Sequence, residues 1–133
     1  MPTILNLLET CIYTRDLAAL ERFYGQVMGL TLISAEHPRY VFFRVSDSSV
    51  LLMFNPDETL NQKDIPAHGA LGPQHFAFAI DHDQLDAWRA HLTEHGVGIE
   101  REHAWPNGAR SIYFRDPAGH SVELVTREIW HRG

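Results

Sequence analysis

The chain has 133 residues, 44% of them hydrophobic, which is enough to bury a core in one domain without disulfides. Its formal net charge is -6, with 11 basic and 17 acidic residues and no basic cluster, so the phosphate contacts that nucleic-acid binding requires are not expected. Cys11 is the single cysteine, and no run approaches the ~20 apolar residues of a membrane span. We therefore expect a cytoplasmic protein that binds a small molecule.

The first half of the chain predicts a strand, a helix and three further strands. Residues 7–13 form the first predicted strand, and Asp16 is a good N-cap for a helix that Gly29 ends. Between these two residues, apolar side chains recur at helical spacing. The later strands are predicted over residues 30–34, 40–45 and 50–54. Residues 55–73 are rich in proline, glycine and polar side chains, which indicates a linker.

The second half repeats this order of elements. A strand is predicted from His75 to Ile80, followed by a helix with Asp83 as N-cap and Gly96 as its end. The three remaining strands are predicted over residues 98–102, 109–115 and 121–126, with a tight turn at residues 116–119 between the last two.

The two halves also share sequence, which indicates an internal duplication. Phe42-Phe43-Arg44 matches Tyr113-Phe114-Arg115, and at the same offset Leu52 corresponds to Glu123. We therefore predict an α+β fold in a single domain over residues 1–133. It would contain a first module at about residues 5–55, a linker at about 56–73 and a second module at about 74–127.

The tandem β-α-β-β-β order, with the stretches RDLAALERFYGQVMGL and YFRDPAGHSVELV, resembles the vicinal oxygen chelate superfamily of glyoxalases, bleomycin resistance proteins and extradiol dioxygenases. The resemblance spans nearly the whole chain. It implies tandem modules that form a curved, cup-like mixed sheet, with helices on the convex side and a metal on the concave face. Such modules often pair between two subunits, so a homodimer is expected.

The resemblance also implies positions for the metal ligands. They fall on Glu9 in the first strand, His75 at the start of the second module and Glu123 on the last strand. Members with glyoxalase I activity use a fourth ligand where Leu52 stands, so this activity is not expected here. Other members usually place a histidine or a glutamine where this chain has Glu9, so Glu9 departs from the family pattern.

Strand alternation tests these positions without reference to a family, because successive side chains face opposite sides of a sheet. His75 shares a face with Ala77 and Ala79, away from Phe76, Phe78 and Ile80. Glu9 and Glu123 also fall opposite large apolar neighbours. A carboxylate on an apolar strand needs a hydrogen bond, an ion pair or a cation. The alternative to a metal is that Arg44, Arg110 or Arg115 neutralises the two glutamates.

Two carboxylates and one imidazole favour a single divalent ion, Mn, Fe, Co, Ni or Zn, and three protein ligands leave positions open for substrate. Glu123 is the predicted catalytic proton carrier. Trp105, Arg110 and Tyr113 are predicted substrate contacts: an aromatic surface in a loop, a cation and a hydrogen-bond donor. For Trp105 the alternative is a loop anchor. His68 and His103 are candidates for substitute ligands or acid-base groups, but solvated loop histidines are the favoured interpretation.

The sequence thus favours a metal-dependent lyase or isomerase of the glyoxalase-like type. It would stabilise an enediolate or oxyanion on a substrate with vicinal oxygens. An extradiol-type dioxygenase is a second enzyme hypothesis. A metal-free binding protein that confers resistance by sequestering a small molecule is the non-enzyme hypothesis.

Overall fold

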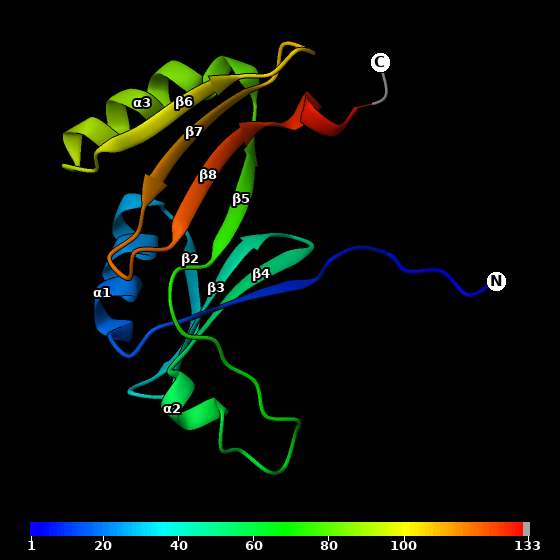
Figure 1. Cartoon of the computed structure of the whole chain (residues 1–133), viewed down its shortest axis with the longest axis vertical. Helices are drawn as coiled ribbons and strands as arrows, with labels where there is room; N and C mark the ends of the chain where they lie inside the picture. The colour runs from blue at the N-terminus through cyan, green and yellow to red at the C-terminus, as the bar shows by residue number, and fades with distance from the viewer. Residues whose placement is uncertain (132–133) are drawn as a thin grey trace. The chain divides into compact units, whose positions relative to one another are not determined.

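The computed structural model describes residues 1–131, and the chain divides into two compact units, Met1–Leu71 and Gly72–Gly133. Each unit contains one repeat and one four-stranded mixed sheet, with the strand orders β1-β4-β3-β2 and β5-β8-β7-β6. The first strand of each sheet pairs in parallel with the last, and the other pairings are antiparallel. These matching topologies confirm the α+β class and the duplication (Figure 1).

The first unit contains β1 (Glu9–Tyr13), α1 (Leu17–Arg22), β2 (Thr31–Glu36), β3 (Tyr40–Ser46), β4 (Ser49–Phe54) and α2 (Pro56–Thr59). Asp16 caps α1 as predicted, because its carboxylate accepts a hydrogen bond from the backbone N–H of Ala19. The helix then widens into a π-helical turn, Phe23–Val27, before the predicted end at Gly29. Gly29 has φ +73°, a left-handed conformation that glycine adopts without strain.

The second unit contains β5 (His75–Ile80), α3 (Leu85–Glu94), β6 (Ile99–Ala104), β7 (Arg110–Arg115) and β8 (Ser121–Thr126). Gly96, with φ +72°, ends α3 as Gly29 ends the first helix. The predicted N-cap at Asp83 is wrong. A 3₁₀ turn, His82–Gln84, precedes α3 and is closed by the Gln84 N–H on the Asp81 carbonyl, so helical structure begins before Asp83.

One face of each sheet packs against the helix of its own unit. In the second unit the alternate residues Ile112, Phe114, Val122 and Leu124 are at most 1% exposed, together with Leu92 of α3. In Figure 1, α3 lies along β6, in agreement with the contacts between them. The opposite face, which we call the open face, carries the residues of alternate parity, and the predicted site residues His75 and Glu123 are among them.

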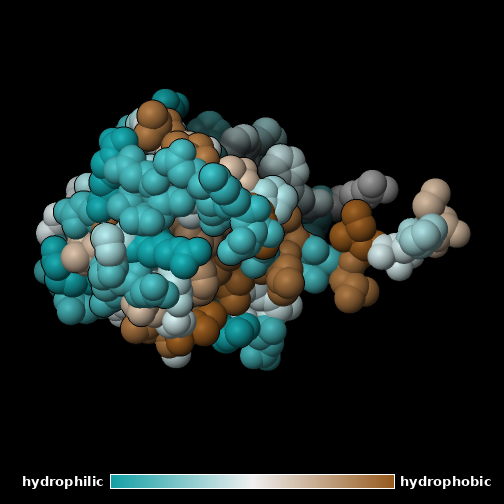
Figure 2. All heavy atoms as spheres, turned by 90° about the horizontal axis from the view of Figure 1, so that it is seen from below, coloured by the Kyte–Doolittle hydropathy of each residue, from teal (hydrophilic) through white to brown (hydrophobic). Residues whose placement is uncertain are grey.

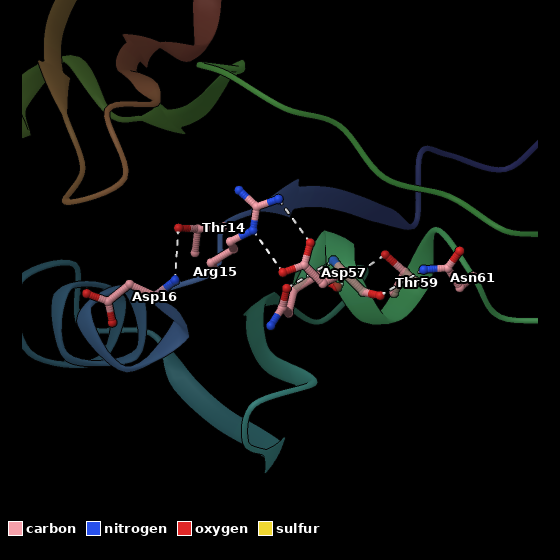
Figure 3. A network of polar contacts seen from close by, with 7 residues as sticks. Thr14, Arg15, Asp16, Asp57, Thr59 and Asn61 are labelled. Atoms are coloured by element: carbon pink, nitrogen blue, oxygen red, sulfur yellow. Dashed lines mark hydrogen bonds and ion pairs between the residues drawn. The ribbon is translucent and has the colours of Figure 1, made fainter.

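The segment predicted to be a linker contains a short helix, α2, that is joined to the first unit. Asn55 caps this helix through its side-chain oxygen. Arg15, between β1 and α1, forms two hydrogen bonds with the Asp57 carboxylate, at 2.8 and 3.0 Å (Figure 3). Part of the predicted linker is therefore folded against the first module.

The Arg15–Asp57 ion pair gives a pH-dependent prediction. The Arg15 guanidinium holds the pKa of the Asp57 carboxyl below its usual range. A lowered pKa in the folded state stabilises the fold above the pKa that Asp57 has in the unfolded chain. This contribution is lost as the pH falls through the folded-state value. In Arg15→Gln we expect an NMR titration of Asp57 to show a pKa closer to that of an ordinary aspartate. An unchanged Asp57 pKa would contradict the ion pair.

Apolar side chains are exposed near the start of the first unit. Ile4, Leu5 and Leu7 are 93%, 95% and 80% exposed. In the space-filling view, apolar spheres are prominent on the projection at the right, where Figure 1 places the N-terminus (Figure 2). Among the described residues, no helix has both the length and the apolar character needed to cross a bilayer.

Candidate functional site

Strand register brings predicted site residues together on the open face of the second sheet. His75 of β5 lies opposite Ser121 of β8, while Glu123 lies between Ala77 of β5 and Tyr113 of β7. These residues all have the same parity, so their side chains leave the sheet on one side. The alanine beside Glu123 has a small side chain, and the histidine ring can therefore approach the carboxylate. The predicted proximity of His75 and Glu123 is observed.

The His75 ring and the Glu123 carboxylate form a close pair. His75 Nε2 lies 3.3 Å from Glu123 Oε1, and the histidine side chain is 52% exposed whereas that of the glutamate is 9% exposed. His75 Nδ1 lies 3.0 Å from the Ser121 carbonyl oxygen, which can only accept a hydrogen bond, so Nδ1 donates. In the neutral ring, Nε2 then presents a lone pair toward the carboxylate. Two electron-rich atoms at this distance favour a cation between them, either a proton or a metal ion.

The second carboxylate oxygen of Glu123, Oε2, accepts a hydrogen bond from a serine hydroxyl. Ser111 of β7, 1% exposed, donates a hydrogen bond of 2.5 Å to Glu123 Oε2. The indole N–H of Trp105 donates in turn to the Ser111 hydroxyl at 2.9 Å. Trp105 therefore anchors the loop between β6 and β7, which was the alternative to a substrate contact. Its ring also lines a hollow on the same face.

No arginine is seen to neutralise Glu123 among residues 1–131. Arg115 pairs with Glu100, and Arg44 donates to the Ser46 carbonyl in the first unit. Arg110 leaves β7 with parity opposite to Ser111 and Tyr113, and lines a separate hollow with residues around the start of α3. The structure therefore does not bring Arg110 to the group that contains Glu123.

A hollow of about 330 Å³ lies beside the pair in the second unit. It is lined by Glu100, Arg101, His103, Trp105, Tyr113 and Ser121. The Tyr113 ring stacks on the His75 ring with centroids 6.3 Å apart, so the hollow adjoins the histidine. Arg101 is exposed and makes no ion pair with any described residue, which leaves its guanidinium available to an anionic group. The volume is suitable for a small organic molecule.

Tyr113 remains a hydrogen-bond donor at neutral pH. Burial raises the pKa of its phenol, and the Glu123 carboxylate raises it further, against the lowering effect of Ser111 and Arg101. The phenol is therefore protonated on the same face as His75 and Glu123. The role of Tyr113 as a donor to substrate stays a prediction.

Glu9, the third predicted ligand, begins β1 in the first unit and shares a face with Cys11 and Tyr13. Burial raises the pKa of the Cys11 thiol, and the Glu9 carboxylate raises it further, against the lowering effect of Tyr13. Cys11 is therefore a protonated, weakly nucleophilic thiol. Within residues 1–131, no three His, Cys, Asp or Glu side chains gather as a metal-binding group. The His75–Glu123 pair is the part of the predicted ligand set that the structure brings together.

Several contributors to this face were not singled out from the sequence. Ser111 and Ser121 share parity with Tyr113 and Glu123, so strand alternation alone would have placed them there. Arg101 pairs with Tyr113, but a bulge between Ile99 and Arg101 shifts the register of β6, and no sequence pattern marks that bulge. The prediction that His68 and His103 are solvated loop histidines is wrong for His103, which lies in β6, and both side chains are partly buried. His103 packs edge-on against Trp105, and His68 bonds Tyr13 in the first unit.

Comparison with known proteins identifies the family. Residues 6–124 match the Glyoxalase/Bleomycin resistance protein/Dioxygenase superfamily. The chain belongs to this superfamily.

Individual relatives carry more specific names. A protein named metallothiol transferase FosB from Bacillus licheniformis is 30% identical over 97% of this chain and 80% of its own length. Another FosB, from Shouchella clausii, is 34% identical over 83% of this chain and 72% of its own. A crystal structure described as lactoylglutathione lyase from Agrobacterium tumefaciens is 37% identical, with a TM-score of 0.91, and the match covers 96% of this chain and 97% of that one.

Proposed function

We propose that this protein is a divalent-metal-dependent enzyme that acts on a small substrate with neighbouring oxygen atoms. The observation that carries the proposal is the His75–Glu123 pair. A buried carboxylate lies 3.3 Å from an imidazole nitrogen, and no arginine neutralises it among the described residues. A buried acid without a cation is costly, and a metal ion would supply the charge that the pair lacks. The names of the FosB relatives, which include the word metallothiol, agree with this choice.

We propose Glu9, His75 and Glu123 as the metal ligands. Two carboxylates and one neutral imidazole suit Mn, Fe, Co, Ni or Zn and leave coordination positions open. A bound ion of this kind supplies Lewis-acid stabilisation of negative charge that develops on substrate oxygens.

The other residues of the open face would bind and orient the substrate. Arg101 offers a guanidinium to an anionic group, and Tyr113 offers a protonated phenol beside the His75 ring. Trp105 provides an aromatic wall in the same hollow. Glu123 is the proposed proton carrier because its carboxylate lies 3.3 Å from the His75 imidazole. We place Arg101, rather than Arg110, in the proposed substrate site.

The exposed apolar residues Ile4, Leu5 and Leu7, together with the edge strands of the two sheets, favour a homodimer. Light scattering coupled to gel filtration would measure the mass directly.

Two reaction classes follow from the names of the relatives. The FosB proteins are named for thiol transfer, and the A. tumefaciens protein for lactoylglutathione cleavage. Leu52 is the equivalent of Glu123 in the first repeat, and its apolar side chain cannot ligate a metal. We therefore favour a site with three protein ligands and a thiol-transfer or related reaction. The lyase is the second candidate, because its structural match is strong.

The test is metal content followed by two assays. Protein purified without chelator should contain close to one transition metal per chain, and added metal should raise its melting temperature. The metal-loaded protein should then consume thiol in the presence of fosfomycin, the compound in the name of a structurally similar resistance protein, FosX from Mesorhizobium loti, or cleave lactoylglutathione. His75→Ala and Glu123→Ala should abolish either activity. Iron with oxygen uptake on a catechol would point to a dioxygenase. Absence of bound metal would favour a metal-free binding protein and overturn the proposal.

A further inference from the structure

The hydroxyl of Ser111 occupies a position that no assigned function explains. It lies between an aromatic donor and a carboxylate, 2.9 Å from the indole nitrogen of Trp105 and 2.5 Å from Glu123 Oε2. Ser111 itself is 1% exposed, so water does not compete for these contacts. A serine hydroxyl has one proton and two lone pairs. When the indole N–H occupies a lone pair, the hydroxyl proton is free to point at Glu123.

Trp105 is itself held in place by its neighbours, so the Ser111 hydroxyl keeps its proton directed at Glu123. The Trp105 backbone N–H bonds the Ala109 carbonyl at 2.8 Å, which closes the loop, and the His103 ring packs edge-on against the indole with centroids 4.5 Å apart. An indole N–H can only donate, so Ser111 cannot turn its own proton toward Trp105. Chains of hydrogen bonds with one direction also polarise each other, which strengthens the bond to Glu123.

These hydrogen bonds fix the orientation of the Glu123 carboxylate. Its Oε2 atom is occupied by the Ser111 proton, while Oε1 faces His75 Nε2 at 3.3 Å. A carboxylate held in this way offers one oxygen, not two, to a cation beside the histidine. The hydrogen bond from Ser111 also restrains the rotation of the carboxylate when no cation is present.

We propose that Ser111 and Trp105 are positioning residues for the metal site: together they hold Glu123 so that it binds a cation through Oε1 alone, next to His75. This proposal rests on the proposed function, because it takes Glu123 and His75 as metal ligands. Groups that orient a ligand from outside the site typically change metal affinity by about 10- to 100-fold.

The first experiment measures zinc affinity by titration calorimetry. Ser111→Ala should weaken zinc binding by about 10- to 100-fold. Trp105→Phe should weaken it by about fivefold, because one hydrogen bond to the hydroxyl is lost while the hydroxyl remains. Ser111→Thr, which keeps the hydroxyl, should bind zinc nearly as well as the unaltered protein. Matched controls are Ser49→Ala, a strand serine bonded to another serine, and Trp88→Phe, whose ring packs on His91.

The double variant tests whether Trp105 acts on Glu123 through Ser111, which we call the relay, or whether the two residues affect zinc binding independently. Because Trp105 acts through Ser111, Trp105→Phe combined with Ser111→Ala should bind zinc as Ser111→Ala alone does. If the two losses multiply instead, Trp105 acts on the site by another route and the relay is wrong.

A second experiment uses the unaltered protein and therefore does not depend on whether a variant folds. The indole N–H resonances of Trp88, Trp105 and Trp130 can be followed by ¹H–¹⁵N NMR while zinc is added. Zinc should move the Trp105 resonance, because its indole N–H donates to Ser111, which in turn donates to the proposed ligand Glu123. The resonances of Trp88 and Trp130 should stay nearly unchanged. An unmoved Trp105 resonance with zinc bound would overturn the relay.

The outcomes distinguish this proposal from the proposed function. If zinc binds, and His75→Ala and Glu123→Ala abolish binding while Ser111→Ala does not weaken it, the relay fails and the metal site stands. If zinc does not bind at all, or binds equally well to His75→Ala, the proposed function itself fails.

Discussion

Replacing Glu123 with glutamine is expected to weaken metal binding by roughly 100-fold or more, because losing a ligand costs more than losing a group that merely orients it. The change is nearly isosteric, and the amide can still accept the hydrogen bond from Ser111, so the fold should persist. Glu123 is 7% exposed, and removing its charge also removes the cost of burying an anion without a cation. Metal-free Glu123→Gln should therefore be at least as stable as the unaltered protein.

Titration with zinc measures the affinity, and thermal unfolding with and without zinc measures the stabilisation. Glu102→Gln is the matched control, because Glu102 lies on the opposite face of β6, where it pairs with Arg89. Equal zinc affinity in Glu123→Gln and Glu102→Gln would show that Glu123 is not a ligand.

Phe114→Ala is expected to destabilise the protein by about 3–5 kcal/mol, through lost burial and the cavity left behind. Phe114 is 0% exposed and lies on β7, on the face opposite Ser111 and Tyr113. A loss of this size is a large part of the ~5–15 kcal/mol that stabilises a typical domain. The melting temperature should fall by on the order of 10 °C.

Phe78→Ala provides the comparison, because Phe78 is only partly buried on β5 and its truncation should cost distinctly less. Urea denaturation of both variants gives the free energies of unfolding. A cost for Phe114→Ala no larger than that for Phe78→Ala would contradict the assignment of Phe114 to the core behind the site.

Much of the fold could be predicted because the order of strands and helix is repeated in the two halves of the sequence. The strands His75–Ile80 and Ser121–Thr126 have the predicted ends, and Gly29 and Gly96 end equivalent helices at positive φ. Two local details could not be predicted. The start of α3 depends on a 3₁₀ turn that has no side-chain cap, and α2 is stabilised by the contact of Asp57 with Arg15, which is distant in sequence.

Strand alternation predicted which residues of the candidate site lie on the same face of the sheet. Alternation placed His75 and Glu123 on one face, and the register of β5 with β8 makes them neighbours. The same rule separates Arg110 from Tyr113, three positions along one strand, so Arg110 should have been assigned to the other face. The part played by Ser111 depends on its short contact with Glu123, and a strand pattern does not indicate such distances.

Anomalous X-ray scattering from crystals grown with a bound transition metal tests the central claim most directly. We expect one strong peak at about 2.0–2.3 Å from both His75 Nε2 and Glu123 Oε1, with the Glu9 carboxylate completing the protein ligands. A peak at any other group of side chains, or no peak in protein saturated with metal, would contradict the metal site and the function built on it.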